Sequence, residues 1–208
     1  MKTLKKHLTL LIAVLMVTAG TVSAQEETVI NFDNATPGTF PEGWTNATGK
    51  WTVKQDGKNK VLAQTEKNSG GYFNIAVYDG VTLKDVEMSV DVRAISGRED
   101  QGGGLVWRYK DKNNYYIVRF NPLEDNYRFY KVENGRRIQL ASAAHITLPE
   151  GKWFTVKVTV KGNKVTCYLN GKKYLEKTDD TFTKPGKVGF WTKADAVSDF
   201  DNLRFKGE

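Results

Sequence analysis

Short runs of strand-forming residues separated by turn residues are the feature that most limits how this chain of 208 residues can fold. The segment 102–132 is the clearest example, and it predicts three strands at about 104–109, 114–121 and 126–133. Similar runs recur along the chain, and no segment shows the 3.6-residue period of an amphipathic helix. Asn134-Gly135 and Asn170-Gly171 favour two-residue hairpins, because both central residues of a type I′ turn need positive φ. About fourteen short strands predict an all-β, two-sheet antiparallel sandwich or jelly roll.

Strand phase sets the segment 102–132 apart from the other predicted strands. The runs 85–93 and 153–161 alternate cleanly between apolar and polar residues, which predicts one face on the core and one in water. On 114–121, in contrast, Tyr116 and Phe120 share one face while Tyr115 and Arg119 share the other. We expect one face to pack on the core and the other to present rings and guanidinium groups. Strand phase alone does not decide which rings pack on the core and which face outward.

The first residues predict an export signal. A basic start containing Lys2 and Lys5 precedes an apolar run at 8–19 that is short for a membrane span, and small residues at 22–24 suit cleavage before Gln25. We therefore expect a signal peptide at 1–24, a single domain at 25–208, and a secreted or periplasmic protein without membrane contact after cleavage. An uncleaved anchor is the alternative.

Composition argues against several classes of function. The formal net charge is +7, of which three charges lie in 1–24, leaving +4 on scattered side chains rather than on a nucleic-acid-binding patch. Cys167 is the only cysteine, so no intrachain disulfide can form, and its phase predicts burial. His145 is the only histidine after residue 24, which argues against a multi-histidine zinc site and gives little support to a Ser–His–Asp triad. The oligomeric state is left open.

Aromatic and basic side chains on predicted neighbouring strands are the strongest positive signal. Rings stack on the C–H face of a sugar, and guanidinium groups donate hydrogen bonds to its hydroxyls. Some of these rings must also belong to the core, so a structural role is the alternative for each. The predicted ligand-binding residues are Trp107, Arg108, Tyr115, Arg119, Arg128, Tyr130, Trp191 and Lys193.

Carboxylates supply the remaining candidates. Asp111 and Asp195 are weak candidates for an acid or a base if the chain is an enzyme. Asp33, Asp199 and Asp201 could hold a structural Ca²⁺ if the end strands meet, with turn capping as the alternative; no other cofactor is expected. The glycine-rich segment 96–104 is either a flexible connection or a loop at the rim of a cleft.

Several motifs together resemble the concanavalin A-like, laminin-G-like jelly-roll superfamily. These are GLVWRY at 104–109 with Asp111 and the NYY at 114–116, GKW at 151–153, NGK at 170–172, GKVGFW at 186–191 and DFDNL at 199–203. The similarity covers nearly all of 28–206 and looks closest to the 3-keto-disaccharide hydrolase branch, which is also described as glycoside hydrolase family 16-like. It implies a jelly roll whose concave face holds carbohydrate. The E-x-D-x-E or E-x-D-x-x-E strand of family 16 glycosidases is absent from the sequence, so no catalytic residue is carried over.

Three functions remain open from the sequence. The leading one is an exported domain that binds a glycan on its concave sheet. The second is a hydrolase acting on a glycoside or a 3-keto-glycoside. The third is a structural or adhesion module that binds a protein, since one fold can serve all three.

Overall fold

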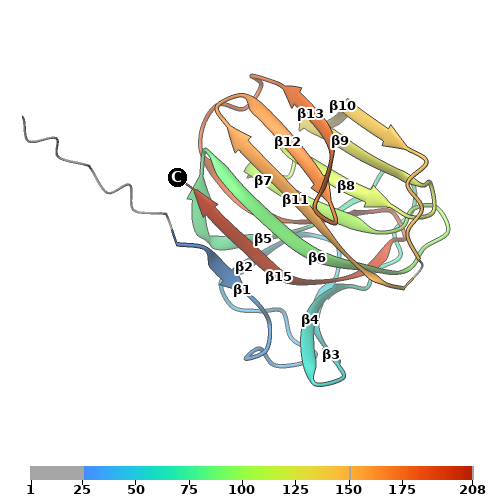
Figure 1. The fold of residues 1–208 in the computed structure, drawn as a ribbon. Coiled ribbons are helices and arrows are strands. Elements are labelled where there is room, and N and C mark those ends of the chain that lie inside the picture. Colours follow the sequence, from blue (N-terminus) through green and yellow to red (C-terminus); the bar gives the residue numbers. More distant parts are fainter. Residues whose placement is uncertain (1–25, 150, 208) are drawn as a thin grey trace, which may run out of the picture.

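The computed structural model describes residues 26–149 and 151–207, and the regular structure within these ranges is entirely β. Figure 1 shows the strands arranged as two facing layers. The predicted signal peptide at 1–24 lies outside the described residues. Within the described part of the chain, no helix is long and apolar enough to cross a bilayer.

The strands are short and are separated by tight turns, as the turn residues of the sequence require. They are β1 (Thr28–Ile30), β2 (Trp44–Thr48), β3 (Trp51–Asp56), β4 (Asn59–Gln64), β5 (Phe73–Leu83), β6 (Val86–Ser96), β7 (Gly103–Asp111), β8 (Asn114–Asn121), β9 (Asn126–Glu133), β10 (Arg136–Ala144), β11 (Trp153–Lys161), β12 (Lys164–Leu169), β13 (Lys172–Thr178), β14 (Gly186–Lys193) and β15 (Val197–Gly207).

The strands form two antiparallel sheets, which confirms the predicted jelly-roll sandwich. One sheet has eight strands in the order β13-β12-β11-β6-β15-β4-β3, with β1 paired to β15. The other has seven strands in the order β10-β9-β8-β7-β14-β5-β2. The hairpins β9–β10 and β12–β13 turn at the two Asn-Gly dipeptides, where all four residues have positive φ.

The main core lies between the sheets, and strand alternation builds it. Val86, Met88, Val90 and Val92 face inward from β6, and β11 contributes its alternate residues from Phe154 to Val160 in the same way. Both patterns match the prediction for strands with one wet face. From β8, the inward residues are Tyr116, Val118 and Phe120, so the opposite half of that strand faces outward.

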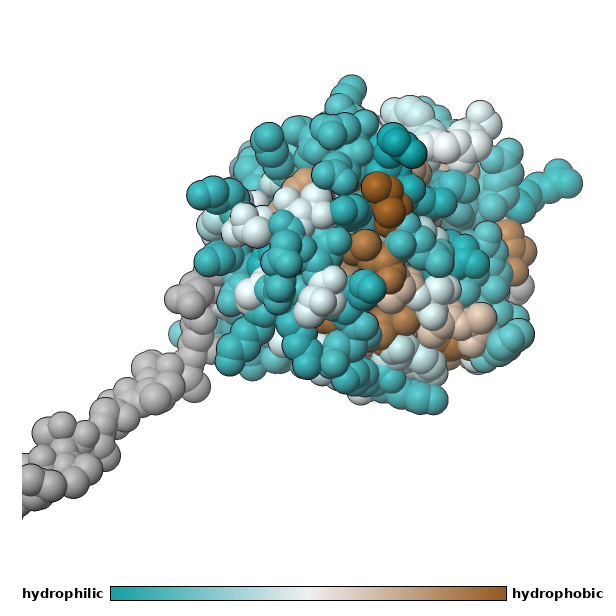
Figure 2. All heavy atoms as spheres, turned by 90° about the horizontal axis from the view of Figure 1, so that it is seen from above, coloured by the Kyte–Doolittle hydropathy of each residue, from teal (hydrophilic) through white to brown (hydrophobic). Residues whose placement is uncertain are grey.

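The strand β2 was not predicted, and its composition explains why. Its sequence WTNAT contains one buried residue, Trp44, and four polar or small residues at the edge of a sheet. The exterior is otherwise mostly hydrophilic. Seen from the side of β10 and β13, Figure 2 shows apolar residues confined to a narrow band.

Candidate functional site

The outer face of the seven-stranded sheet carries its own cluster of buried apolar side chains, separate from the main core. We call it the outer-face cluster; it consists of Ile75, Val77, Val106, Tyr115, Ile117, Tyr130, Val132 and Trp191, with Ala47, Phe73 and Tyr109 packed against it. These residues alternate along each strand with those that face the other sheet. The outward face of a β-sandwich is usually exposed to solvent. Tyr115 and Trp191 are nevertheless fully buried on this face, so neighbouring side chains must cover their rings.

Six of the eight predicted ligand-binding residues lie on this one face. Strand register brings them together, because Arg128 pairs with Arg119, Arg119 with Gly104, and Gly104 with Trp191 in one transverse row. The six are Tyr115, Arg119, Arg128, Tyr130, Trp191 and Lys193.

Trp107 and Arg108 lie elsewhere. Trp107 belongs to the core between the sheets, where it stacks on Tyr116 at 5.5 Å and on Phe129 at 5.3 Å. Arg108 sits in an irregularity of β7 with φ of 46° and donates to the carbonyl oxygens of Phe182 and Gly162, both at 2.6 Å. Both contacts tie connections together at one end of the sandwich, which is a structural role.

Arg137 is one of three residues of this site, with Asp100 and Glu124, that sequence reasoning missed. It lies on β10, opposite Val132, and its guanidinium carbon is 4.6 Å from the ring centroid of Tyr130, 5.5 Å from that of Phe73 and 5.9 Å from that of Trp191. Its Nη1 is buried without a hydrogen-bond partner among the described residues. The hairpin at Asn134-Gly135 was the available signal, because a two-residue turn fixes which residues of β9 and β10 share a face.

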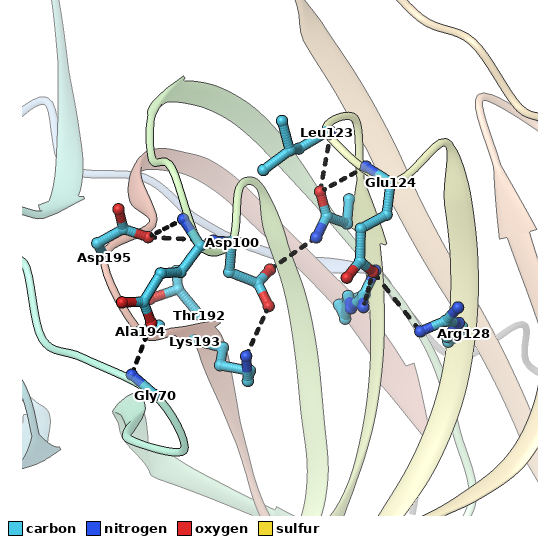
Figure 3. A network of polar contacts seen from close by, with 12 residues as sticks. Gly70, Asp100, Leu123, Glu124, Arg128, Thr192, Lys193, Ala194 and Asp195 are labelled. Atoms are coloured by element: carbon cyan, nitrogen blue, oxygen red, sulfur yellow. Dashed lines mark hydrogen bonds and ion pairs between the residues drawn. The ribbon is translucent and has the colours of Figure 1, made fainter.

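One end of the outer face is polar, and its centre is Asp100. This carboxylate accepts a hydrogen bond from Asn121 Nδ2 at 2.8 Å and lies 3.2 Å from Lys193 Nζ. Figure 3 shows Asp100 beside Lys193. Only 4 % of its side chain is exposed, and burial raises the pKa of this carboxyl above its ordinary value of 3.8, although the charges of Arg119 and Lys193 oppose that change.

A second carboxylate, Glu124, lies beyond Arg119. Its Oε2 accepts from Arg119 Nη2 and from Asn126 Nδ2, both at 2.9 Å, and lies 3.5 Å from Arg128 Nη1. Burial alone would raise the pKa of Glu124, but the hydrogen bonds from Asn126 and Arg119 outweigh it and hold the pKa below the ordinary value. The charge of Glu124 contributes to raising the pKa of Asp100, so the two carboxylates interact electrostatically.

Asp195 and Asp111, the predicted acid or base candidates, hold backbone in place. Asp195 accepts from the backbone N–H groups of Arg98 at 2.6 Å, Glu99 at 3.0 Å and Asp100 at 3.0 Å (Figure 3). Burial opposes ionisation of Asp195, but these backbone hydrogen bonds keep its pKa below the ordinary value. Asp111 accepts from Asn113 N at 2.8 Å within the β7–β8 turn. Asp195 therefore fixes the loop that presents Asp100.

The carboxylates predicted to hold Ca²⁺ make other contacts. Asp199 is fully buried and pairs with Lys54 at 2.6 Å and with Arg93 at 2.8 Å, while Asp201 accepts from Asn59 Nδ2 at 2.8 Å. The described residues contain no group of three or more His, Cys, Asp or Glu side chains placed to hold a metal ion. Calcium binding at Asp33, Asp199 and Asp201 stays a prediction, and the two cations on Asp199 argue against it.

The outer-face cluster, with Arg137 over its rings and the Asp100–Glu124 end beside it, places apolar side chains, hydrogen-bond donors and acceptors together on one side of the sheet. Such a mixture suits a polyhydroxylated ligand with an apolar face.

Known proteins share this architecture. Levanase of Bacillus subtilis is 25 % identical over 164 residues, which cover 77 % of this chain and 22 % of levanase. The chain thus spans about a fifth of that protein. The structure of the carbohydrate-binding module CBM66 from Bacillus subtilis aligns with a TM-score of 0.67 at 23 % identity, over 79 % of this chain and 96 % of the module. Domain 4 of the extracellular arabinanase AbnA of Geobacillus stearothermophilus, in complex with arabinotriose, aligns with a TM-score of 0.57 at 16 % identity, over 86 % of this chain and 90 % of that domain. Residues 30–206 match the family described as the 3-keto-alpha-glucoside-1,2-lyase-like domain, and the chain therefore belongs to that family.

Proposed function

We propose that this chain is an exported domain that binds a glycan on the outer face of its seven-stranded sheet. The observation that carries the proposal is the position of Arg137, whose guanidinium lies over three rings and has a buried N–H without an acceptor. A buried donor without a partner is unfavourable, and a ligand that brings an acceptor oxygen relieves it. The names of the similar modules support carbohydrate as the ligand. The N-terminal sequence supports export of the protein.

The charged end of the face supplies the directional contacts. Arg119 Nε is buried and has no hydrogen-bond partner among the described residues, and it lies beside the ring of Tyr130. Asp100 and Glu124 accept hydrogen bonds, so sugar hydroxyls can donate to one end of the site and accept from Arg137 and Arg119. The hydrogen bonds within this network hold the groups in place before the ligand arrives, which lowers the entropic cost of binding.

Isothermal titration calorimetry against a panel of soluble oligosaccharides, including fructans and arabinans, tests the proposal. We expect saturable binding that weakens at least tenfold in Arg137→Ala. Arg136→Ala is the matched control, because Arg136 is the exposed neighbour on the same strand. Absence of binding to the whole panel, together with specific capture of an envelope protein, would instead favour the adhesion module.

A second candidate function is lyase chemistry at Asp100 and Glu124, which the family description and the opposed pKa shifts favour. Two interacting carboxyls whose pKa values are pushed apart suit one acid and one base. In a 3-keto-glucoside the C2 proton is acidic because it adjoins the C3 carbonyl. Glu124 would take this proton as the C1–O bond breaks, and the departing oxygen would take a proton from the Asp100 carboxyl, which burial makes easier to protonate.

Product release from a 3-keto-α-glucoside, followed by chromatography, separates the two functions. If the domain is a lyase, Asp100→Asn and Glu124→Gln each lower turnover by at least a hundredfold. Asp180→Asn, at an exposed position, should leave turnover unchanged. A wild-type protein that binds glycans but releases no product would rule out the lyase and leave the binding function.

A further inference from the structure

A cavity of about 730 Å³ lies on the opposite side of the seven-stranded sheet from the outer-face cluster. It is lined by the β1–β2 connection, including Asn34, Phe40 and Glu42, and by the side chains of Trp44 and Tyr78. Trp44 belongs to the inter-sheet core and Tyr78 packs against it, so these residues face away from the outer-face cluster. One sugar residue therefore cannot contact both sites.

The walls of this cavity are fixed by contacts that do not involve a ligand. Lys60 Nζ donates to the carbonyl oxygens of Asp33 at 2.8 Å and Ala35 at 2.9 Å, which holds the first wall. The second wall is tied to β3, because Gly38 N donates to Val53 O at 2.8 Å and Val53 N donates to Thr39 O at 2.7 Å. A pocket formed in advance in this way is typical of a small-molecule site.

The floor of the cavity is aromatic. The ring centroids of Trp44 and Tyr78 are 5.3 Å apart, and Trp44 also lies 5.6 Å from Phe32. Phe40 and Tyr78 are only half buried, so ring surface is available to a ligand. Stacking on such rings favours a ligand with a flat C–H face.

The rim selects among ligands by charge. Asn34 and Glu42 are exposed, and no hydrogen bond or ion pair joins their side chains to any other described residue. Glu42 is the only charged residue that lines the cavity, and the Lys60 ammonium behind the first wall is taken up by two carbonyl oxygens, which disfavours an anionic ligand. Polar groups are interspersed with the rings, which disfavours a lipid chain. An amide, a carboxylate and aromatic rings together match a neutral sugar.

We infer that this cavity is a second saccharide site, which binds a neutral sugar residue with its C–H face toward Trp44 and Tyr78 and its hydroxyls toward Asn34 and Glu42. The inference extends the proposed function to another part of the fold, and it stands or falls separately from the outer-face site. With two sites on opposite sides of one sheet, the domain would bind two chains of a polysaccharide at once.

Calorimetry and hydrogen–deuterium exchange on the full chain test the second site, with neutral oligosaccharides and a uronic acid oligomer as probes. We expect two binding events for a neutral oligosaccharide in the wild type. The double variant Asn34→Ala/Glu42→Gln should lose one event, with at least a tenfold rise in Kd, whereas Arg137→Ala should lose the other. Glu27→Gln is the matched control for the charge change, because Glu27 is exposed and directly precedes β1.

Exchange locates each event independently of any variant. Neutral sugar should protect the backbone amides of 31–43, and this protection should persist in Arg137→Ala. Protection confined to β8, β9 and β10 overturns the second site and leaves the outer-face proposal intact. Protection confined to 31–43 overturns the outer-face proposal and leaves the second site intact. No binding of any probe overturns both proposals, and preferential binding of the uronic acid oligomer at 31–43 overturns the assignment to neutral sugars.

Discussion

The guanidinium carbon of Arg137 lies 4.6 Å from the centroid of the Tyr130 ring on the outer face of the seven-stranded sheet. The two residues come from adjacent strands, and an unpaired N–H of the arginine is buried beside the rings. The rings hold the guanidinium in one orientation, so its N–H groups point in fixed directions. The contribution of these donors to binding can therefore be measured separately from that of the positive charge.

Arg137→Lys tests that separation. Lysine keeps the charge but loses the planar donor set, so we expect glycan affinity to fall by at least tenfold, about 1.4 kcal/mol, with little change in thermal stability. Calorimetry and a thermal melt measure the two effects. Equal affinity for Arg137→Lys and the wild type would show that charge alone acts there.

Trp107→Ala should mainly affect folding. The ring is fully buried between Tyr116 and Phe129, so its removal should lower the free energy of unfolding by about 3–5 kcal/mol. Urea denaturation measures this change. Trp153→Ala is the control, because that ring is 37 % exposed and should cost far less. Equal losses for the two variants would contradict the assignment of Trp107 to the core.

Asp195→Ala should loosen the loop that carries Asp100. Three backbone N–H groups lose their acceptor, and because water reaches this site the global cost should be only about 1 kcal/mol. Hydrogen–deuterium exchange at 98–100 should accelerate markedly, whereas exchange in β11 should not change. Asp111→Ala, which removes a cap from a different turn, serves as the comparison. Unchanged exchange at 98–100 would show that the conformation of this loop does not depend on Asp195.

The pH dependence of stability should report on Asp100. Burial raises the pKa of this carboxyl, so the folded state binds its proton more tightly than the unfolded state does. Its contribution therefore becomes less favourable as pH rises through the interval that starts near the ordinary value of 3.8. Asp100→Asn lacks this titration, so the stability of the variant relative to wild type should increase with pH across that interval. Urea denaturation between about pH 3.5 and 7 measures it, and a flat or falling difference would contradict the raised pKa.

Cys167 should be unreactive in the native protein. The thiol is free and buried, and burial raises its pKa well above the ordinary value, so little thiolate is present. Alkylation followed by mass spectrometry should show modification only at the rate of unfolding. Rapid labelling of the native chain would show that β12 opens locally.

The sequence predicted which residues alternate along β8 and β9, but it could not say which half faces the other sheet. Tyr115 and Tyr116 are equally buried, one in the outer-face cluster and the other in the main core, so hydrophobicity does not distinguish them. Only the way in which the two sheets pack together decides which face of β8 points toward the core. Six of the eight predicted ligand-binding residues nevertheless share one face, since strand phase is reliable within a regular strand.

Irregular backbone accounts for Arg108, Asp100 and Glu124, which the sequence misplaced or missed. Arg108 has positive φ in a register shift of β7, so counting by twos from Val106 of the outer-face cluster fails to place it. Asp100 and Glu124 lie in connections, where no strand period predicts the direction of a side chain. Their importance depends on Asn121, Lys193 and Arg119, which come from other segments of the chain.

Arg137 lies on β10, which is the edge strand of its sheet and is mostly exposed. A substitution at Arg137 alters the outer face, whereas Leu140, Ala141 and Ala143 of the same strand pack against the core between the sheets. Edge strands also tolerate insertions and bends that central strands do not. The outward side chains of an edge strand are therefore positions at which the proposed binding face can vary while the sandwich stays the same.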